Sequence, residues 1–354
     1  MAERLRVALL YGGRSGEHEV SLRSAASVGA ALQAQHDVLP VFIDKRGRWL
    51  LRSAVEAPVG RLVFVVPSPA DRGRLRLLES GAVAAEPDAY FPVLHGTFGE
   101  DGTVQGLLEL AGVPYVGSGV AASAAAMDKA LMKALFGQAG LPQVDYRVLL
   151  GRDAQAEQRA LEELGLPLFV KPANLGSSVA VSKVRTAGQL GPALDAALAY
   201  DRKVLIEAAA CQAREIEVAV LGNDEPQSSL PGEVLPDREF YDYESKYSSA
   251  SRTKLVIPAV LSDAQRAQIR ALAVRAFQAV DACGFARVDF FLEKTSGKLL
   301  LNEINTIPGF TSISMFPKMW EASGLGYAEL LGQLVELGRE RHARRASLRT
   351  DYGP

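Results

Sequence analysis

Two apolar segments near the C-terminal end of the sequence carry polar side chains at every second position. Arg287 and Asp289 alternate with apolar residues in the first segment, and Glu303 and Asn305 do so in the second. Because side chains alternate between the two faces of a β-strand, each pair is predicted to share one face. Residues 293–297 between the segments are typical of a turn, so the strands should pair as an antiparallel hairpin. Such a hairpin would bring all four polar side chains onto one surface.

The composition of this surface indicates its chemistry. Carboxylate and amide oxygens are the ligands that Mg²⁺ prefers, and a guanidinium group binds phosphate. Arg287, Asp289, Glu303 and Asn305 therefore suit a nucleotide–metal site at which a phosphoryl group is transferred. A surface hairpin with a solvated charged face is the alternative, and the hairpin by itself does not decide between the two.

Length, charge and cysteine content exclude several classes of protein. The chain has 354 residues, of which 48% are apolar, enough for a large core divided over two or three domains. A formal net charge of −2 argues against broad nucleic-acid binding. The two cysteines, Cys211 and Cys283, lack the spacing of a metal site or a disulfide framework. No signal peptide or membrane-spanning segment is predicted, so we expect a soluble, cytoplasmic protein without a membrane partner.

Strand-like and helix-like segments alternate along residues 1–125, which are predicted to form an α/β domain with a parallel sheet. A helix over Met127–Ala139 begins a different region, and a helix over Tyr327–Gly338 is the last predicted element. Between them, the polar, tyrosine-rich segment 232–253 is predicted to be a mobile loop that acts as a lid. A basic run near the end is interpreted as a solvated helix end or a frayed tail; it consists of Arg339, Arg341, Arg344 and Arg345.

The glycine-rich segment 12–19 lies between the first predicted strand and the helix that follows it. Glycines at such a junction let a ligand approach the backbone and the helix N-terminus. A dinucleotide fingerprint with Asp44 as its acid is a rival interpretation, but the G-x-G-x-x-G spacing is absent. Glu17 at the tip of this loop could hold a substrate ammonium group, or it could be an ordinary capping acid of the helix.

Lys171 stands at a predicted strand end, before the Gly-Ser-Ser sequence at 176–178. Loop N–H groups and hydroxyls can cradle phosphates while the lysine supplies charge, although the spacing is not that of a Walker A sequence. Glu207 ends an apolar strand, where it could hydrogen-bond a ribose or an amine. Lys129 opens a helix, and both Lys129 and Glu207 are also compatible with ordinary surface positions.

Six longer motifs follow one another along the chain. They are Gly-Gly-x-Ser-x-Glu-His-Glu-Val-Ser at 12–21, His-Gly-x-Phe-Gly-Glu-Asp-Gly-Thr-Val-Gln-Gly at 95–106, Gly-Ser-Gly-Val-x-Ala-Ser-x-x-x-Met-Asp-Lys at 117–129, Lys-Pro-Ala-Asn-x-Gly-Ser-Ser-Val at 171–179, Phe-Tyr-Asp-Tyr-Glu-x-Lys-Tyr at 240–247 and Asn-Glu-x-Asn-Thr-x-Pro-Gly-Phe-Thr-Ser at 302–312. In this order, and over nearly the whole length, they resemble the motifs of the D-alanine–D-alanine ligases, a branch of the ATP-grasp superfamily.

The resemblance implies an α/β fold of three domains. These are an N-terminal parallel-sheet α/β domain at 1–125, a small central α+β domain at 126–212 and a C-terminal α+β domain at 213–340, with a basic tail at 341–354. It further implies a homodimeric enzyme that ligates two D-alanines to D-alanyl-D-alanine for peptidoglycan synthesis. ATP and two Mg²⁺ or Mn²⁺ ions would take part, an acyl phosphate would be the intermediate, and ADP and phosphate would be released.

The resemblance also implies roles for individual residues. ATP would be bound by Lys129, Lys171, Ser178, Glu207, Ala208, Ala210 and Glu215. Two metal ions would be held by Asp289, Glu303 and Asn305, while Arg287 and the Gly309 backbone would stabilise the transferring phosphate and the tetrahedral intermediate. Glu17, Ser177 and Tyr247 would form a hydrogen-bonded triad beside the first D-alanine, with His95 near that substrate. The carboxylate of the second D-alanine would contact Lys246 and Ser314.

The sequence departs from the family pattern in two places. Ala180 stands where the family commonly has glycine, so a positive φ at this position would strain the backbone. The segment 207–215 is one residue longer than in some relatives. Two rival functions remain: a related ligase that uses D-lactate or another acceptor, and a non-catalytic nucleotide-binding regulator. The intact metal and arginine set argues against the regulator.

Overall fold

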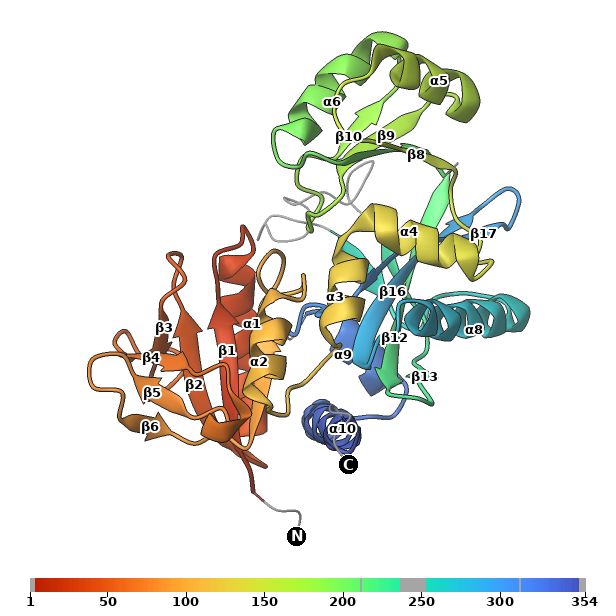
Figure 1. The fold of residues 1–354 in the computed structure, drawn as a ribbon. Coiled ribbons are helices and arrows are strands. Elements are labelled where there is room, and N and C mark those ends of the chain that lie inside the picture. Colours follow the sequence, from red (N-terminus) through yellow and green to blue (C-terminus); the bar gives the residue numbers. More distant parts are fainter. Residues whose placement is uncertain (1–3, 211, 236–252, 312, 350–354) are drawn as a thin grey trace.

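A computed structural model describes residues 4–210, 212–235, 253–311 and 313–349 of the chain. These residues form three β-sheets that follow one another along the sequence, each with helices packed against it (Figure 1). Among the described residues, none of the helices combines the length and apolarity that crossing a bilayer requires.

The N-terminal sheet has the strand order β6-β5-β4-β3-β2-β1-β7. Strand β1 pairs in parallel with β2 and β7, as predicted, whereas β3 to β6 extend the sheet in antiparallel order. The prediction of a parallel sheet was therefore right for three strands only, because short strands joined by tight turns pair in antiparallel order. The strands are β1 Arg6–Gly12, β2 Asp37–Ile43, β3 Trp49–Leu51, β4 Arg61–Val65, β5 Leu75–Leu77, β6 Val83–Ala85 and β7 Ala89–Val93; the helices are α1 His18–Leu32, η1 Pro69–Asp71 and α2 Thr103–Ala111.

A pair of helices follows, of which the second confirms the helix predicted over Met127–Ala139 to within two residues, whereas the first was not predicted. Helix α3 spans Val120–Met127 and α4 spans Lys129–Gln138. Asp128 separates them with φ −84° and ψ 100°, and its side chain accepts hydrogen bonds from the backbone N–H groups of Ala130 and Leu131. Asp128 is thus the N-cap of helix α4, a position at which aspartate is strongly preferred.

The central sheet has the order β10-β9-β11-β8 and is antiparallel throughout. Helices α5 and α6 cover the face that points away from the rest of the molecule (Figure 1). The strands are β8 Tyr146–Leu149, β9 Leu168–Pro172, β10 Ser182–Val184 and β11 Val204–Ala208; the helices are α5 Ala154–Leu164, η2 Ala187–Gln189 and α6 Leu190–Leu198.

The C-terminal sheet has the order β15-β14-β12-β16-β17, with β13 paired to β12. The predicted hairpin is confirmed as the antiparallel pair β16–β17. The first four residues of the predicted loop 232–253 form strand β14 instead, and residues 236–252 lie outside the described part of the chain. The elements are β12 Ala213–Gly222, β13 Gln227–Ser228, β14 Gly232–Leu235, β15 Lys254–Val256, α8 Asp263–Ala279, β16 Gly284–Glu293, β17 Leu299–Asn305, α9 Met315–Ala322 and α10 Tyr327–Ala346.

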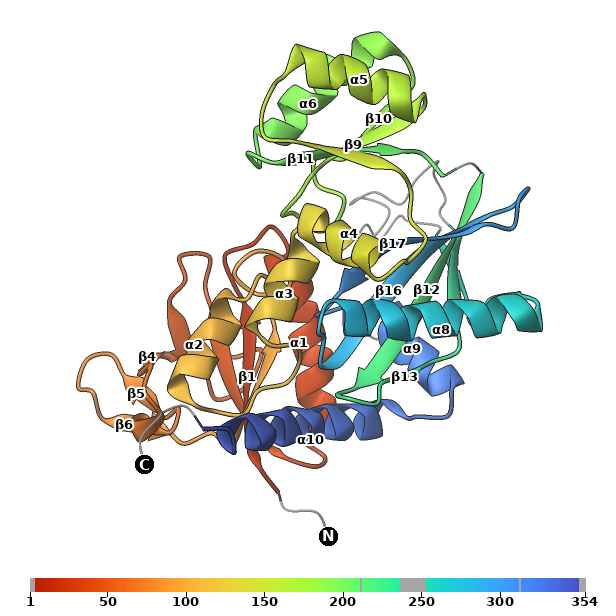
Figure 2. The same cartoon turned by 45° about the vertical axis from the view of Figure 1, so that its right-hand side comes forward.

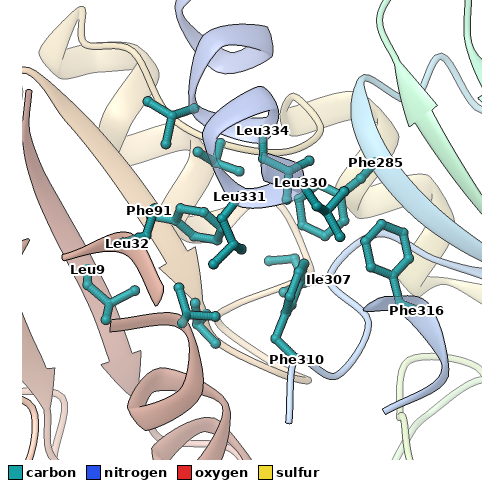
Figure 3. Packing of buried hydrophobic residues seen from close by; sticks show 14 of the residues in the cluster. Leu9, Leu32, Phe91, Phe285, Ile307, Phe310, Phe316, Leu330, Leu331 and Leu334 are labelled. Atoms are coloured by element: carbon teal, nitrogen blue, oxygen red, sulfur yellow. The ribbon is translucent and has the colours of Figure 1, made fainter. Parts of the chain in front are cut away.

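Helix α10 joins the N-terminal and C-terminal sheets along their base (Figure 2). Its apolar face contributes Leu330, Leu331 and Leu334 to a core that also contains Leu9 of β1 and Phe91 of β7 (Figure 3). The helix continues to Ala346, eight residues beyond the predicted end at Gly338, so the first part of the expected basic tail is helical.

Arginines of the last two turns of α10 bind the N-terminal sheet's helix α2. Arg341 Nη1 donates to Glu109 Oε1 at 2.9 Å, and Arg345 Nε lies 3.1 Å from Glu109 Oε2. The guanidinium of Arg341 also lies over the ring of Tyr115, 4.1 Å from its centroid. Arg341 is therefore a largely buried contact between helices α10 and α2, in contrast to the solvated arginine that was predicted.

Candidate active site

A cavity of about 470 Å³ lies between the central sheet and the C-terminal sheet. This volume is within the range of pockets that bind small ligands. Most of the predicted site residues line it: Lys129, Lys171, Ser177, Ser178, Glu207, Ala208, Ala210, Glu215, Arg287, Asp289, Glu303 and Asn305. Residues that are distant in the sequence thus converge on one space.

The β16–β17 hairpin supplies one wall of the cavity. Its register places Asp289 opposite Glu303 and Arg287 opposite Asn305, so all four side chains share one face as predicted. Arg287 binds Asp289 through two hydrogen bonds of 2.7 Å, and Asn305 Nδ2 donates to Asp289 Oδ2 at 3.0 Å. Arg287 Nε also lies 3.0 Å from Glu217 Oε2 of β12. Burial alone would lower the pKa of Arg287, but the charges of Asp289 and Glu217 outweigh it and raise the pKa.

This face fits a divalent cation by the chemistry of its donors. Asp289, Glu303 and Asn305 offer carboxylate and amide oxygens, which are the donors that Mg²⁺ and Mn²⁺ prefer. Within the described ranges, no three His, Cys, Asp or Glu side chains gather as a metal cluster, so the amide of Asn305 would complete the set. Both carboxylates already lie near cations, since Asp289 is bonded to Arg287 and Glu303 Oε2 is 3.9 Å from Lys129 Nζ.

Lysines from two elements gather around one buried carboxylate on the opposite wall. Lys171 Nζ lies 2.6 Å from Glu207 Oε2, and Lys133 Nζ lies 3.4 Å from Glu207 Oε1. Burial raises the pKa of Glu207, but the charges of Lys133 and Lys171 outweigh it, so the pKa is lowered overall. Burial lowers the pKa of Lys133, against the opposing charge of Glu207.

Lys133 was missed in the sequence, although its side chain is 0% exposed. It lies four residues after Lys129 in helix α4, hence on the same side of the helix. That spacing was the available signal, and it is weak because lysines at this spacing are common on exposed helix faces.

The loop between β9 and β10 carries three non-glycine residues with positive φ: Ser177 at +52°, Ser178 at +58° and Ala180 at +56°. The sequence predicted strain at Ala180 if φ were positive, and the φ value confirms that condition. The hydroxyl of Ser177 donates a short hydrogen bond to Glu17 Oε1. This bond connects the loop beside the cavity to the N-terminal sheet.

Glu17 lies between glycines of two different sheets. A Cβ atom on Gly96 would lie 2.6 Å from Glu17 Oε2, and one on Gly176 would lie 3.0 Å from the same oxygen. The position precedes α1, but the Glu17 side chain makes no capping hydrogen bond to that helix. Glu17 is therefore not an ordinary capping acid of α1. Its carboxylate faces the Ser177 loop instead.

His95 and Glu100 follow strand β7; His95 is buried, and Glu100 is partly buried at the cavity. His95 Nδ1 bonds the carbonyl of Ile307 at 2.9 Å, and its Nε2 bonds Ser24 Oγ at 3.1 Å. Burial lowers the pKa of His95, so the ring is neutral near pH 7. Burial, reinforced by the charge of Glu17, raises the pKa of Glu100 to about 8. Glu100 lines the cavity, but no role was predicted for it from the sequence. Its place in the 95–106 motif was the available signal.

Gly309 and Ser314 lie beyond strand β17. Ser314 precedes helix α9, and its Oγ accepts from the Thr311 backbone N–H at 3.0 Å. A Cβ atom on Gly309 would lie 3.0 Å from that same Oγ, so the two predicted residues are neighbours. Four of the predicted residues lie outside the cavity lining: Glu17, His95, Gly309 and Ser314. Glu17 is connected to the lining by its hydrogen bond with Ser177, and His95 bonds Ile307, which follows the lining residue Thr306.

Comparisons with known proteins agree with this arrangement. Family models described as D-ala D-ala ligase N-terminus and D-ala D-ala ligase C-terminus match residues 6–118 and 135–336. The chain belongs to the D-alanine–D-alanine ligase family. A relative from Heliobacterium modesticaldum, named D-alanine--D-alanine ligase, is 50% identical to it, and the alignment covers 98% of each chain.

Solved structures of D-alanine–D-alanine ligase relatives share the fold. The D-alanine-D-alanine ligase from Coxiella burnetii superposes with a TM-score of 0.86 at 39% identity, covering 98% of this chain and 97% of that one. The VanG D-Ala:D-Ser ligase from Enterococcus faecalis gives 0.85 at 32% identity, covering 95% and 100%. The predicted family and the three-part α/β architecture are thereby confirmed. Of the residues predicted for this family's site, Lys246 and Tyr247 lie outside the described residues.

Proposed function

We propose that this protein is an ATP-dependent ligase that joins two D-alanine molecules into D-alanyl-D-alanine, a precursor for peptidoglycan. The observation that carries the proposal is the convergence, in one cavity, of two lysines and the hairpin face of Arg287, Asp289, Glu303 and Asn305, in a chain of this family. A cavity with this combination of charges suits a nucleotide triphosphate with its metal ions. We also propose a cytoplasmic location and a homodimer, as in the family that the sequence resembles.

ATP would lie between the central and C-terminal sheets. Lys129 and Lys171 would contact phosphate oxygens, together with Ser178 and the loop N–H groups. The edge of the cavity formed by β11 and β12 would hold the nucleoside through Glu207, Ala208, Ala210 and Glu215. The buried, ionised state of Glu207 supports this, because a fixed carboxylate can accept from an amine or a hydroxyl.

Asp289, Glu303 and Asn305 would hold two Mg²⁺ or Mn²⁺ ions. When bound, such ions neutralise the negative charge of the transferring phosphoryl group. Arg287 is charged at any physiological pH and lies on the same face, so it would stabilise the transferring phosphate from the protein side. The Gly309 backbone would donate to the oxyanion of the tetrahedral intermediate.

The first D-alanine would bind on the N-terminal side of the cavity. The Glu17 carboxylate would accept from its ammonium group, and Ser177 would keep that carboxylate in place. His95 would lie near the same substrate, with Tyr247 beside it. Ser314 and Lys246 would bind the carboxylate of the second D-alanine.

The reaction would proceed in two steps. A carboxylate oxygen of the first D-alanine attacks the γ-phosphorus of ATP, the bond to ADP breaks, and an acyl phosphate forms. The neutral amine of the second D-alanine then attacks the acyl carbon, the carbon–oxygen bond to phosphate breaks, and the amine loses a proton. Positioning and charge neutralisation would supply most of the rate acceleration.

Phosphate release tests the proposal. The purified protein, ATP and Mg²⁺ are combined with D-alanine, with L-alanine, or with D-alanine plus either D-serine or D-lactate, and the products are identified by mass. We expect D-alanyl-D-alanine as the main product and no reaction with L-alanine. A preferred D-serine or D-lactate product would show an acceptor-variant ligase. Nucleotide binding without phosphate release under every condition would show a regulator.

A further inference from the structure

The backbone of Ile307 is held at both of its polar groups by one loop of the N-terminal sheet. Its carbonyl bonds His95 Nδ1 at 2.9 Å, and its N–H donates to Glu100 Oε1 at 3.2 Å. His95 and Glu100 belong to the loop that follows β7, whereas Ile307 follows β17 of the C-terminal sheet. At Ile307, two hydrogen bonds therefore link the loop after β7 to the segment after β17.

The other ends of both side chains are also fixed. A carbonyl oxygen only accepts, so His95 donates from Nδ1 and its Nε2 must accept from the hydroxyl of Ser24. The second oxygen of Glu100 accepts from the backbone N–H of Gly96 at 2.6 Å. Each side chain is thus tied to the N-terminal sheet at one end and to Ile307 at the other.

The position of Ile307 gives this contact its meaning. Ile307 lies two positions after Asn305, which belongs to the predicted metal face, and two positions before Gly309. On the other side, Gly96 touches the Glu17 carboxylate, since a Cβ atom there would lie 2.6 Å from Oε2. The hydrogen bonds to Ile307 therefore set the distance between the residue proposed to bind the first ammonium group and the face proposed to transfer phosphate.

We propose that His95 and Glu100 are positioning residues that clamp Ile307 and so hold segment 305–309 in register with Glu17. This proposal rests on the ligase function proposed above. It assigns Glu100 a positioning role, and it assigns His95 the same role in addition to its place near the substrate. Two reacting groups on different sheets need such a link, because a displacement of about 1 Å can cost about a hundredfold in rate.

Steady-state kinetics with three variants test the clamp. Glu100→Gln keeps one acceptor oxygen in place of two, and we expect kcat/KM for D-alanine to fall about ten- to a hundredfold while KM for ATP changes less than about threefold. His95→Asn places an amide where Nδ1 lies and can still donate to Ile307, whereas His95→Gln places its amide nearer Nε2. The clamp predicts that His95→Asn retains more activity than His95→Gln. Equal loss in both histidine variants, or an unchanged Glu100→Gln enzyme, would overturn it.

Amide hydrogen exchange provides a readout that does not depend on catalysis. The Ile307 N–H is bonded to Glu100, so peptides that cover residues 302–310 should exchange faster in Glu100→Gln than in the wild type. Glu109→Gln is the matched control, because it breaks another contact between the N-terminal sheet and α10 without touching Ile307. Unchanged exchange in Glu100→Gln would refute the clamp. A wild type that makes no dipeptide would refute the ligase function instead, while the exchange result would still decide the clamp.

Discussion

Lys133 and Glu207 form an ion pair in the interior, with their side chains 0% and 3% exposed and the ammonium nitrogen 3.4 Å from Oε1. Lys171 binds the other oxygen of the same carboxylate at 2.6 Å. Removing one partner of a buried ion pair leaves an uncompensated charge in a medium that solvates it poorly. Lys133 does not line the cavity, so it should act on the nucleotide site through Glu207.

Replacing Lys133 by methionine tests this relationship. We expect the free energy of unfolding to fall by about 3 kcal/mol and the Kd for ATP to rise about tenfold, since Glu207 would retain a single cation. Chemical denaturation and calorimetric titration with a non-hydrolysable ATP analogue measure the two effects. Lys294→Met, at an exposed lysine in the β16–β17 turn, is the control and should change neither quantity. Wild-type affinity in Lys133→Met would show that the pair is purely structural.

Glu303→Gln should abolish turnover without unfolding the protein. Glu303 pairs with Asp289 across the hairpin, and its replacement removes one of the two carboxylates from the proposed metal set. We expect the rate of phosphate release to fall at least about a hundredfold, because the charge of the bound cations would be less well balanced. Thermal unfolding should stay near that of the wild type. Normal phosphate release at ordinary Mg²⁺ concentrations would contradict the assignment of this face.

Ala180→Gly should stabilise the protein. Ala180 has a φ of +56°, a conformation that costs an alanine about 1–2 kcal/mol. Relief of the strain provides the gain, and the greater flexibility of glycine in the unfolded chain offsets part of it. We therefore expect the free energy of unfolding to rise by about 0.5–1 kcal/mol. Ala271→Gly, in the exposed middle of helix α8, should have the opposite effect of about 1 kcal/mol. Destabilisation by Ala180→Gly would show that the alanine methyl group makes contacts that outweigh the backbone strain.

The contact between Glu109 and helix α10 should make stability depend on pH. Burial raises the pKa of Glu109, but hydrogen bonds from Tyr115 and Arg341 outweigh it, so the folded pKa lies below the ordinary value near 4.5. A lowered carboxyl pKa stabilises the folded state above the unfolded value, and this contribution disappears as the pH falls through the folded pKa. Glu109→Gln should thus cost about 2 kcal/mol at pH 7 and progressively less below about pH 4.5. Denaturation at pH 7, 5 and 3 checks this; a constant difference would contradict it.

The β16–β17 site could be predicted from the sequence because its signal is local. Strand alternation put Arg287 and Asp289 on one face, and the short turn at 293–297 left antiparallel pairing as the only simple connection. The contact between Ser177 and Glu17 was expected from the family motifs, since no local pattern joins residues 160 positions apart. Family resemblance thus supplied the long-range part of the site.

Burial and long-range packing explain what was missed. Little in the sequence distinguishes Lys133 from a solvated lysine, because its burial depends on how α4 packs against the C-terminal sheet and meets Glu207 of the central sheet. The short helix α3 was not predicted, and the N-cap residue Asp128 separates it from the predicted helix α4. Arg341 looked like part of a charged tail because its partner, Glu109, lies 232 residues earlier in the chain.

Helix α10 also has a consequence for the order in which this protein matures on the ribosome. The core formed by Leu9 and Phe91 is completed by Leu330, Leu331 and Leu334, which are translated last. At about 5–20 residues per second, the interval between these two parts of the chain is on the order of ten to fifty seconds. During that interval α1 already packs on this face through Val28 and Leu32, but the part that α10 covers lacks its partner. Such an exposed apolar surface is a natural client surface for a chaperone.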